Sequence, residues 1–176
     1  MARAARLCGC ASLVRLFSSE DWVIERFMNR GVDGTVVPRL ESDDQALRTV
    51  EAARYCFPGG HADKIIVIQI ETANALETLD AFLATDGTDV YFLDSVDLVK
   101  AYGYMGDCHH PAMKERIAAA VGRIRKVGKS AGMLVACDDV CDYVGLGVRF
   151  LYTHANDFLR IGAAAFVSEV GARGAR

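Results

Sequence analysis

The sequence lacks several features that would point directly to a function. It has no run of like charges and a formal net charge of −3, so no basic face for nucleic acid is expected. Its apolar stretches, such as residues 65–70 and 161–167, are far shorter than the roughly 18 residues that a membrane span needs. The phosphate-binding glycine motifs and the nucleophile elbow G-x-S-x-G are absent. We therefore expect neither nucleic acid nor membrane as a partner.

Cysteine is present but sparse. Six cysteines are scattered over the 176 residues, without the density of a small secreted scaffold, so we expect reduced thiols. Cys137 and Cys141 lie four residues apart, and Cys108 precedes two histidines. No second pair stands at the spacing of a zinc site, so both groups favour a structural role over metal binding. With 52% hydrophobic and 24% charged residues, the composition is that of a single globular domain.

The N-terminus has no acidic residue before Glu20. Arg3, Arg6 and Arg15 lie among alanines and serines, a composition typical of a mitochondrial transit peptide. Residues 12–17 are equally typical of a short buried strand. We expect a cytoplasmic protein, with the mitochondrion as the alternative location.

Short aliphatic runs alternate with segments of helical spacing. The predicted strands are residues 13–17, 35–40, 64–71, 89–94, 132–136 and 149–154. The predicted helices are residues 20–29, 43–55, 73–84, 111–126 and 138–144. Because the strands are apolar at consecutive positions, the repeated βα order indicates an α/β protein with a parallel sheet covered by helices.

Two architectures fit this order, a doubly wound sheet and a (β/α)8 barrel. In both, the carboxyl ends of the strands meet at one rim, where ligands bind. The polar residues expected at this rim are Arg15, Arg39, Glu71, Asp94, Asp97 and His154. A complete barrel takes about 250 residues, so the six units predicted here would be two units short of one.

Two carboxylates and one arginine of this rim form a candidate site. Glu71 ends the third strand, and Asp97 follows the next strand by a short turn. Such carboxylates can share a divalent cation, because hard oxygen ligands leave positions for water and a chelating substrate. Arg15 would supply a fixed positive charge for a carboxylate or a developing oxyanion. Taken singly, each has a simpler explanation: Glu71 is a carboxylate beside a helix start, Asp97 a turn residue and Arg15 a surface charge. Together they indicate a site.

Several stretches in this order resemble the HpcH/HpaI aldolase family. They are Leu13-Val14-Arg15-Leu16, residues 31–42, Ile68-Gln69-Ile70-Glu71-Thr72, residues 92–98, residues 128–132 and residues 145–150. Each short motif alone is weak, whereas their combined order is specific. The resemblance covers nearly the whole chain, from residue 12 to about residue 166.

The resemblance implies a TIM (β/α)8 barrel of the pyruvate-aldolase type. This chain, truncated at its N-terminus, would carry strands three to eight in one partial domain over residues 1–176. Glu71 and Asp97 would bind Mg²⁺ or Mn²⁺, and Arg15 would stabilise a pyruvate enolate. Backbone N–H groups at Ser95, Val96 and Asp97 would hold the pyruvate carboxylate. The implied lyase reaction cleaves a 4-hydroxy-2-oxo or 2-keto-3-deoxy acid to pyruvate and an aldehyde.

The chain departs from the family pattern at three places, one of which is the loop of residues 56–64, shorter here than in many members. The family's second strand carries a histidine for proton transfer, and this chain begins after that point; His61 and His154 are the candidates to replace it. The turn after the fourth strand contains the additional carboxylate Asp94. Two alternatives therefore stay open. One is a catalytically impaired barrel that binds metal or a keto acid without turnover, and the other is a flavodoxin-like regulatory domain whose acidic pocket contains Asp94 and Asp97.

An open sheet would leave unpaired strand edges and apolar surface exposed, so we expect a homo-oligomer. The resemblance implies hexamers that exchange C-terminal helices. Residues 1–11 contain no predicted element, and residues 167–176 are expected to fray.

Overall fold

Six parallel strands form one sheet in the computed structural model, which describes residues 1–104 and 107–174. They are β1 (Leu13–Arg15), β2 (Gly34–Val37), β3 (Ile65–Ile70), β4 (Val90–Leu93), β5 (Ser130–Leu134) and β6 (Phe150–Tyr152). Each of the six predicted strands overlaps one of them, so the strand predictions are confirmed, with ends that differ by a few residues.

Helices follow the strands largely where their spacing predicts. The confirmed helices are α2 (Asp21–Met28), α3 (Asp43–Cys56), α7 (Pro111–Lys126) and α8 (Val140–Leu146). The helix predicted over residues 73–84 is instead two helices, α4 (Ala73–Glu77) and α5 (Leu79–Leu83), which meet at Thr78. Three further elements were not predicted as helices: α1 (Ala2–Leu7), α6 (Ser95–Ala101) and α9 (Ala155–Gly174).

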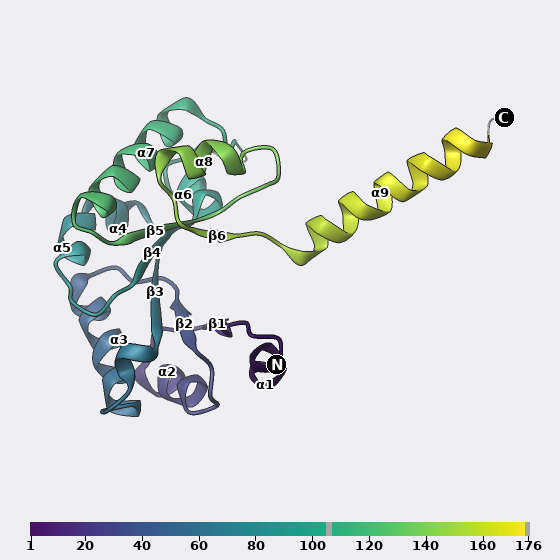
Figure 1. Ribbon diagram of the computed structural model, residues 1–176. Coiled ribbons are helices and arrows are strands. Elements are labelled where there is room, and N and C mark those ends of the chain that lie inside the picture. Colours follow the sequence, from purple (N-terminus) through teal and green to yellow (C-terminus); the bar gives the residue numbers. More distant parts are fainter. Residues whose placement is uncertain (105–106, 175–176) are drawn as a thin grey trace.

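The strands lie in the sheet in the order of the chain, from β1 to β6. A doubly wound sheet reverses direction at a switch point and has helices on both faces, whereas sequential right-handed crossovers place them on one face. Figure 1 shows α2, α3, α5 and α7 on the same side of the strands. The sheet is therefore a half-barrel of the TIM type, and the doubly wound and flavodoxin-like alternatives are wrong.

The outer face of the sheet, which the helices cover, holds the main hydrophobic core. Ile68, Ile70, Tyr91 and Leu93 are fully buried in it. The Tyr91 hydroxyl donates a hydrogen bond of 2.6 Å to the carbonyl oxygen of Phe82 in α5, which satisfies the one polar atom of this buried ring. The stability of the fold therefore depends mainly on contacts between the strands and the helices.

The inner face of the sheet carries a smaller cluster, formed by Val67, Val90 and Phe92. The Phe92 ring meets the Phe150 ring edge to face, with centroids 6.3 Å apart. Gly132 lies between them, and a Cβ atom there would come within 3.0 Å of both rings. The inner face is thus apolar and aromatic but only partly filled.

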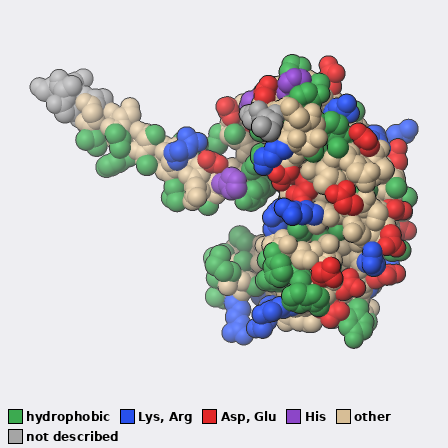
Figure 2. Space-filling view, turned by 180° about the vertical axis from the view of Figure 1, so that it is seen from behind, with side chains coloured by type: hydrophobic (Ala, Val, Ile, Leu, Met, Phe, Trp, Pro, Cys, Tyr) green, Lys and Arg blue, Asp and Glu red, His purple; other side chains and the backbone are tan. Residues whose placement is uncertain are grey.

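Both ends of the chain are helical, although the residue spacing predicts no helix there. Residues 1–11 contain α1, which buries no residue, and α9 continues to Gly174, within the segment 167–176 that was expected to fray. Both helices are rich in alanine, the strongest helix former. Fraying of the last residues stays a prediction. Figure 2 shows α9 projecting from the body with hydrophobic side chains along it. No helix in the described ranges is long and apolar enough to cross a membrane.

Candidate metal centre

Three carboxylates come together at the carboxyl rim of the half-barrel. Glu71 directly follows β3, Asp94 directly follows β4, and Asp97 lies in the first turn of α6. One oxygen of each lies within 4.8 Å of the others, and among the described residues this is the one such group of three or more His, Cys, Asp or Glu side chains. The structure thus brings Glu71 and Asp97 together and adds Asp94 to them.

Glu71 is the buried member of this carboxylate cluster. Its side chain is 5% exposed, and its Oε2 accepts a hydrogen bond of 3.4 Å from Arg15 Nη2. Its Oε1 is buried without a hydrogen-bond partner and lies 4.0 Å from Nε of Arg39. Burial raises the pKa of this carboxyl, an effect that the Arg15 charge and the backbone N–H of Arg39 oppose and that Asp94 and Asp97 increase. A cation would satisfy the unpartnered oxygen.

Arg39 reaches Glu71 from an uncommon backbone conformation. Its φ of 56° is in the left-handed region, where a residue other than glycine is seldom found. Such strain is often located at functional sites, where the surrounding structure holds it in place. The sequence placed Arg39 at the rim but did not predict this approach to Glu71.

Gln69 orients two members of the site, although the sequence reasoning did not select it. Its Oε1 accepts a hydrogen bond of 2.8 Å from Nε of Arg15, and its Nε2 donates one of 2.6 Å to Oδ2 of Asp94. The signal was present, because Gln69 is the one polar residue of an otherwise aliphatic strand, two positions before Glu71 and so on the same face. Arg15 is therefore held in place by both Gln69 and Glu71.

The turn after β4 is already hydrogen-bonded to its own carboxylate. Oδ1 of Asp94 accepts hydrogen bonds of 3.2 Å from the backbone N–H groups of Val96 and Asp97, and so caps α6. These are two of the three N–H groups that the resemblance assigns to a substrate carboxylate; the third belongs to Ser95, a buried residue. Asp97 in turn accepts a hydrogen bond of 2.9 Å from Lys100.

The carboxylate cluster opens into a concavity of about 680 Å³ on the inner face of the sheet. Its lining includes Arg15, Gln69, Asp94, Asp97, Phe92, Phe150, Tyr152 and His154. His154 follows β6, and its Nδ1 lies 3.0 Å from the Tyr152 hydroxyl. His61 begins the short 3-10 helix η1 (His61–Asp63), and its side chain lies outside the described part of the structure.

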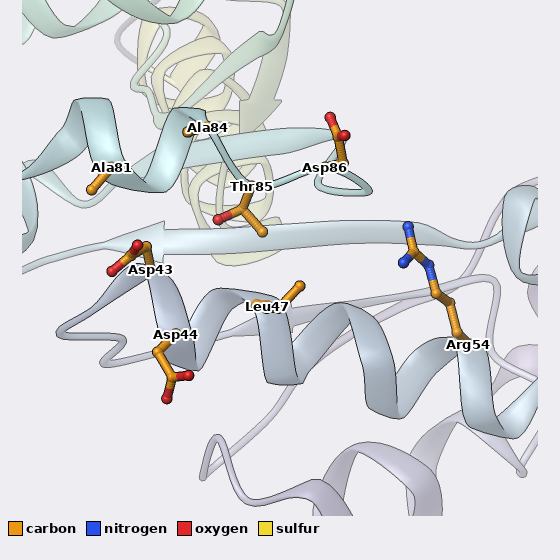
Figure 3. A pocket seen from close by; sticks show the side chains of 8 residues that line it. All are labelled: Asp43, Asp44, Leu47, Arg54, Ala81, Ala84, Thr85 and Asp86. Atoms are coloured by element: carbon orange, nitrogen blue, oxygen red, sulfur yellow. The ribbon is translucent and has the colours of Figure 1, made fainter.

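A second hollow lies between two of the helices that cover the outer face of the sheet. Figure 3 shows it between α3 and α5, with Asp43, Asp44 and Asp86 at its edges and Arg54 at one end. The three carboxylates are exposed to solvent. The cluster around Glu71 is therefore the stronger candidate for a functional site.

The oxygen ligands of the cluster fit a hard divalent ion. Carboxylates suit Mg²⁺ and Mn²⁺, and the unpartnered oxygen of Glu71 gives such an ion a place to bind. A parallel α/β half-barrel with acidic and basic side chains at its carboxyl rim has the architecture of TIM-barrel enzymes, whose active sites lie at this rim.

The chain belongs to the HpcH/HpaI aldolase/citrate lyase family, whose sequence model matches residues 1–153. It is 31% identical to a 4-hydroxy-2-oxovalerate aldolase from Rhodococcus jostii over 165 residues, which cover 81% of this chain and 64% of that protein. It is 29% identical over 163 residues to a hydroxypyruvate/pyruvate aldolase from Roseobacter denitrificans, with 79% of this chain and 64% of that protein covered. The chain thus spans about 64% of the length of these relatives.

The fold is also shared with solved structures. An HpcH/HpaI aldolase/citrate lyase family protein from Burkholderia cenocepacia superposes with a TM-score of 0.84 at 20% identity. The superposition covers 96% of this chain and 77% of that one. It confirms that the six strands form part of a barrel of this type.

Proposed function

We propose that this chain is a divalent-metal-dependent carbon–carbon lyase. It would cleave a 4-hydroxy-2-oxo acid or a 2-keto-3-deoxy acid to pyruvate and an aldehyde. The observation that carries the proposal is the buried Glu71, which shares a carboxylate cluster with Asp97, contacts Arg15 through Oε2 and has an unpartnered Oε1. The aldolase names of the two relatives support the same reaction class.

Three charged side chains of the rim have roles in this proposal. Glu71 and Asp97 would hold Mg²⁺ or Mn²⁺, which supplies Lewis-acid polarisation of a keto oxygen when bound. Arg15 would face the negative charge that develops on that oxygen, because its guanidinium stays ionised and is already oriented by Gln69. The substrate carboxylate would lie against the backbone N–H groups of residues 95–97.

The reaction requires two proton transfers. The 4-hydroxyl of the substrate loses its proton, the bond between C3 and C4 breaks, and the aldehyde leaves. The electron pair of the broken bond stays on the pyruvate fragment, and C3 then takes up a proton. His154 is our candidate for the proton acceptor, since its ring lines the same concavity and its Nδ1 lies 3.0 Å from the Tyr152 hydroxyl.

A second candidate function is binding of metal or keto acid without turnover. It is favoured by the half-barrel, because strand β1 pairs only with β2 and β6 only with β5 within the described ranges. The inner concavity is therefore open on the side between β1 and β6, and water can reach the reacting groups.

The test combines metal binding with product release. Mn²⁺ binding by calorimetry and pyruvate release from a panel of 4-hydroxy-2-oxo acids are measured for the wild-type chain and for Glu71→Gln. Glu51→Gln, which changes an exposed carboxylate of α3, is the matched control. We expect Glu71→Gln to weaken Mn²⁺ binding by at least about 100-fold and to abolish release.

Each outcome selects between the candidates. Mn²⁺-dependent release that only Glu71→Gln loses supports the lyase. Mn²⁺ binding without release selects the second candidate. Equal Mn²⁺ binding by the wild-type chain and Glu71→Gln would overturn both.

We also propose that the chain associates with further copies of itself. Phe158, Leu159, Phe166 and Val167 of α9 are each more than half exposed, and a projecting apolar helix is typical of an interface. The mass in solution, measured by light scattering, should be a multiple of the chain mass and should fall in Phe166→Asp. A monomeric wild-type chain contradicts this proposal.

A further inference from the structure

Asp94 is a carboxylate of the candidate metal centre, yet both of its oxygens already accept hydrogen bonds from the protein. Oδ1 accepts from the N–H groups of Val96 and Asp97, each at 3.2 Å, and Oδ2 accepts from Gln69 at 2.6 Å. A carboxylate with this number of donors is less available to a metal ion than Glu71, whose Oε1 has none. Asp94 is therefore chemically distinct from the other members of the cluster.

The donors that Asp94 uses are those that an incoming carboxylate would need. Val96 and Asp97 line the inner concavity together with Asp94. An α-keto acid that approaches a cation at Glu71 and Asp97 brings a carboxylate of its own, which needs N–H donors on the protein side. The two N–H groups beside the cluster already donate to Asp94. The Asp94 side chain therefore occupies the position beside these N–H groups that a ligand carboxylate would take, and carries the same negative charge.

The negative charge of Asp94 also disfavours binding of a carboxylate ligand. A second carboxylate close to Asp94 would be repelled, and the cost of like charges is large where the surroundings are partly buried. Without the charge of Asp94, the cluster would be less negative by one unit and would repel an anion less.

We propose that Asp94 is a specificity-determining residue that competes with the carboxylate of keto-acid ligands for the N–H groups of Val96 and Asp97. This inference rests on the proposed function, because it requires a metal ion at Glu71 and Asp97. A keto acid binds only by displacing the Asp94 side chain. Ligands that reach the cluster through neutral carbonyl or hydroxyl oxygens leave Asp94 in place. Asp94 therefore shifts the preference of the site from carboxylate ligands towards such neutral ligands.

The probe is oxalate, which chelates a cation and has carboxylates as its only polar groups. Its affinity for the Mn²⁺-loaded chain is measured by electron paramagnetic resonance for the wild type, Asp94→Ala and Asp94→Asn. Asp139→Asn is the matched control, because Oδ1 of Asp139 also accepts a backbone N–H, that of Ala136, at 2.8 Å, outside the cluster. Melting temperatures check that each variant folds; asparagine is itself a good N-cap, so Asp94→Asn should keep α6 intact.

We expect Asp94→Ala to bind oxalate at least about tenfold more tightly than the wild type, because both the occupying group and its charge are gone. Asp94→Asn should show a smaller increase, since its amide oxygen still accepts from the two N–H groups. Asp139→Asn should leave oxalate affinity unchanged, and all these variants should retain Mn²⁺ binding.

Two results would overturn the inference. The first is oxalate affinity that does not increase in either Asp94 variant. The second is loss of Mn²⁺ binding in Asp94→Asn as severe as in Glu71→Gln, which would make Asp94 a metal ligand. A wild-type chain that binds no Mn²⁺ refutes the proposed function and this inference together, whereas Mn²⁺ binding with unchanged oxalate affinity refutes this inference alone.

Discussion

The two faces of the sheet are built from alternate residues of the same strands, yet they differ in almost every physical respect. On the outer face, Ile68 and Leu93 are fully buried against helices. On the inner face, Gln69 and Phe92 border an open concavity that ends at the carboxylate cluster. The comparison teaches that this chain obtains its stability from one face and its candidate chemistry from the other. Substitutions on the two faces should therefore have different consequences.

The largest expected effect is on stability, from the matched pair Leu93→Ala and Leu134→Ala. Leu93 faces the helices and is fully buried, whereas Leu134 lines the concavity and is only partly buried. Leu93→Ala should lower the free energy of unfolding by about 3 kcal/mol, because it leaves a cavity in a packed core. Leu134→Ala should cost less than about 1 kcal/mol, because less apolar area is buried there. Urea titration measures both, and equal costs would mean that the inner face is covered in solution.

The next effect is on metal affinity, from Gln69→Leu. This change removes the amide that orients Arg15 and Asp94 while keeping a similar side-chain volume. Mn²⁺ affinity should fall about 10-fold, because Gln69 holds Arg15, which in turn donates to the proposed metal ligand Glu71. Calorimetry with Mn²⁺ gives the affinity, and the melting temperature serves as the control. An unchanged affinity would show that the inner-face hydrogen bonds do not support the candidate centre.

A smaller effect is expected on the outer face from Tyr91→Phe. The buried hydroxyl donates to the Phe82 carbonyl, and its removal leaves that carbonyl without this donor. The free energy of unfolding should fall by about 1 kcal/mol, while Mn²⁺ affinity stays unchanged. Denaturation and metal titration of the same preparation test this, and altered metal affinity would contradict the separation of the two faces.

The smallest effect concerns the opposite end of the strands. At the start of β1 and β2, the N–H and hydroxyl of Ser12 both donate to Asp33 Oδ2 at 2.7 Å, and these bonds lower the pKa of the Asp33 carboxyl. A carboxyl whose pKa is lower in the folded chain adds stability above its unfolded pKa of about 3.9, and that stability is lost as the pH falls through the folded pKa. Melting temperatures below pH 4 should therefore fall less steeply in Asp33→Asn than in the wild type. Parallel curves would show that these hydrogen bonds add no acid sensitivity.

Much of the fold follows from local sequence. Each of the six strands was predicted, because aliphatic runs at consecutive positions leave few alternatives. Local sequence did not choose between a barrel and a doubly wound sheet, since strand order depends on packing between distant segments; the family resemblance predicted the barrel, which is confirmed. Helix α6 was missed because Asp94 and Asp97 were interpreted as turn residues, whereas Asp94 caps a helix. Helix α9 was missed because it lacks the polar and apolar faces on which the prediction relies.

The candidate site was only partly predictable. The rim positions of Glu71 and Asp97 follow from strand ends, and the structure places them within one cluster. The use of the Val96 and Asp97 N–H groups by Asp94 depends on how the turn folds, which spacing alone does not determine. The approach of Arg39 to Glu71 likewise depends on a single backbone angle.

The sequential order of the strands has a consequence for how the molecule assembles. Within residues 1–104 and 107–174, every strand pairs only with the strands next to it along the chain, so paired strands are separated by a single βα connection. Chains dominated by such near-neighbour contacts can form their structure by successive addition from a small nucleus. The pairs of β3 with β2 and with β4 join four residues each, against three for β1 with β2 and for β5 with β6. Amide hydrogens should therefore exchange slowest in β3 and β4, and unfolding should proceed from the two outer strands towards the centre.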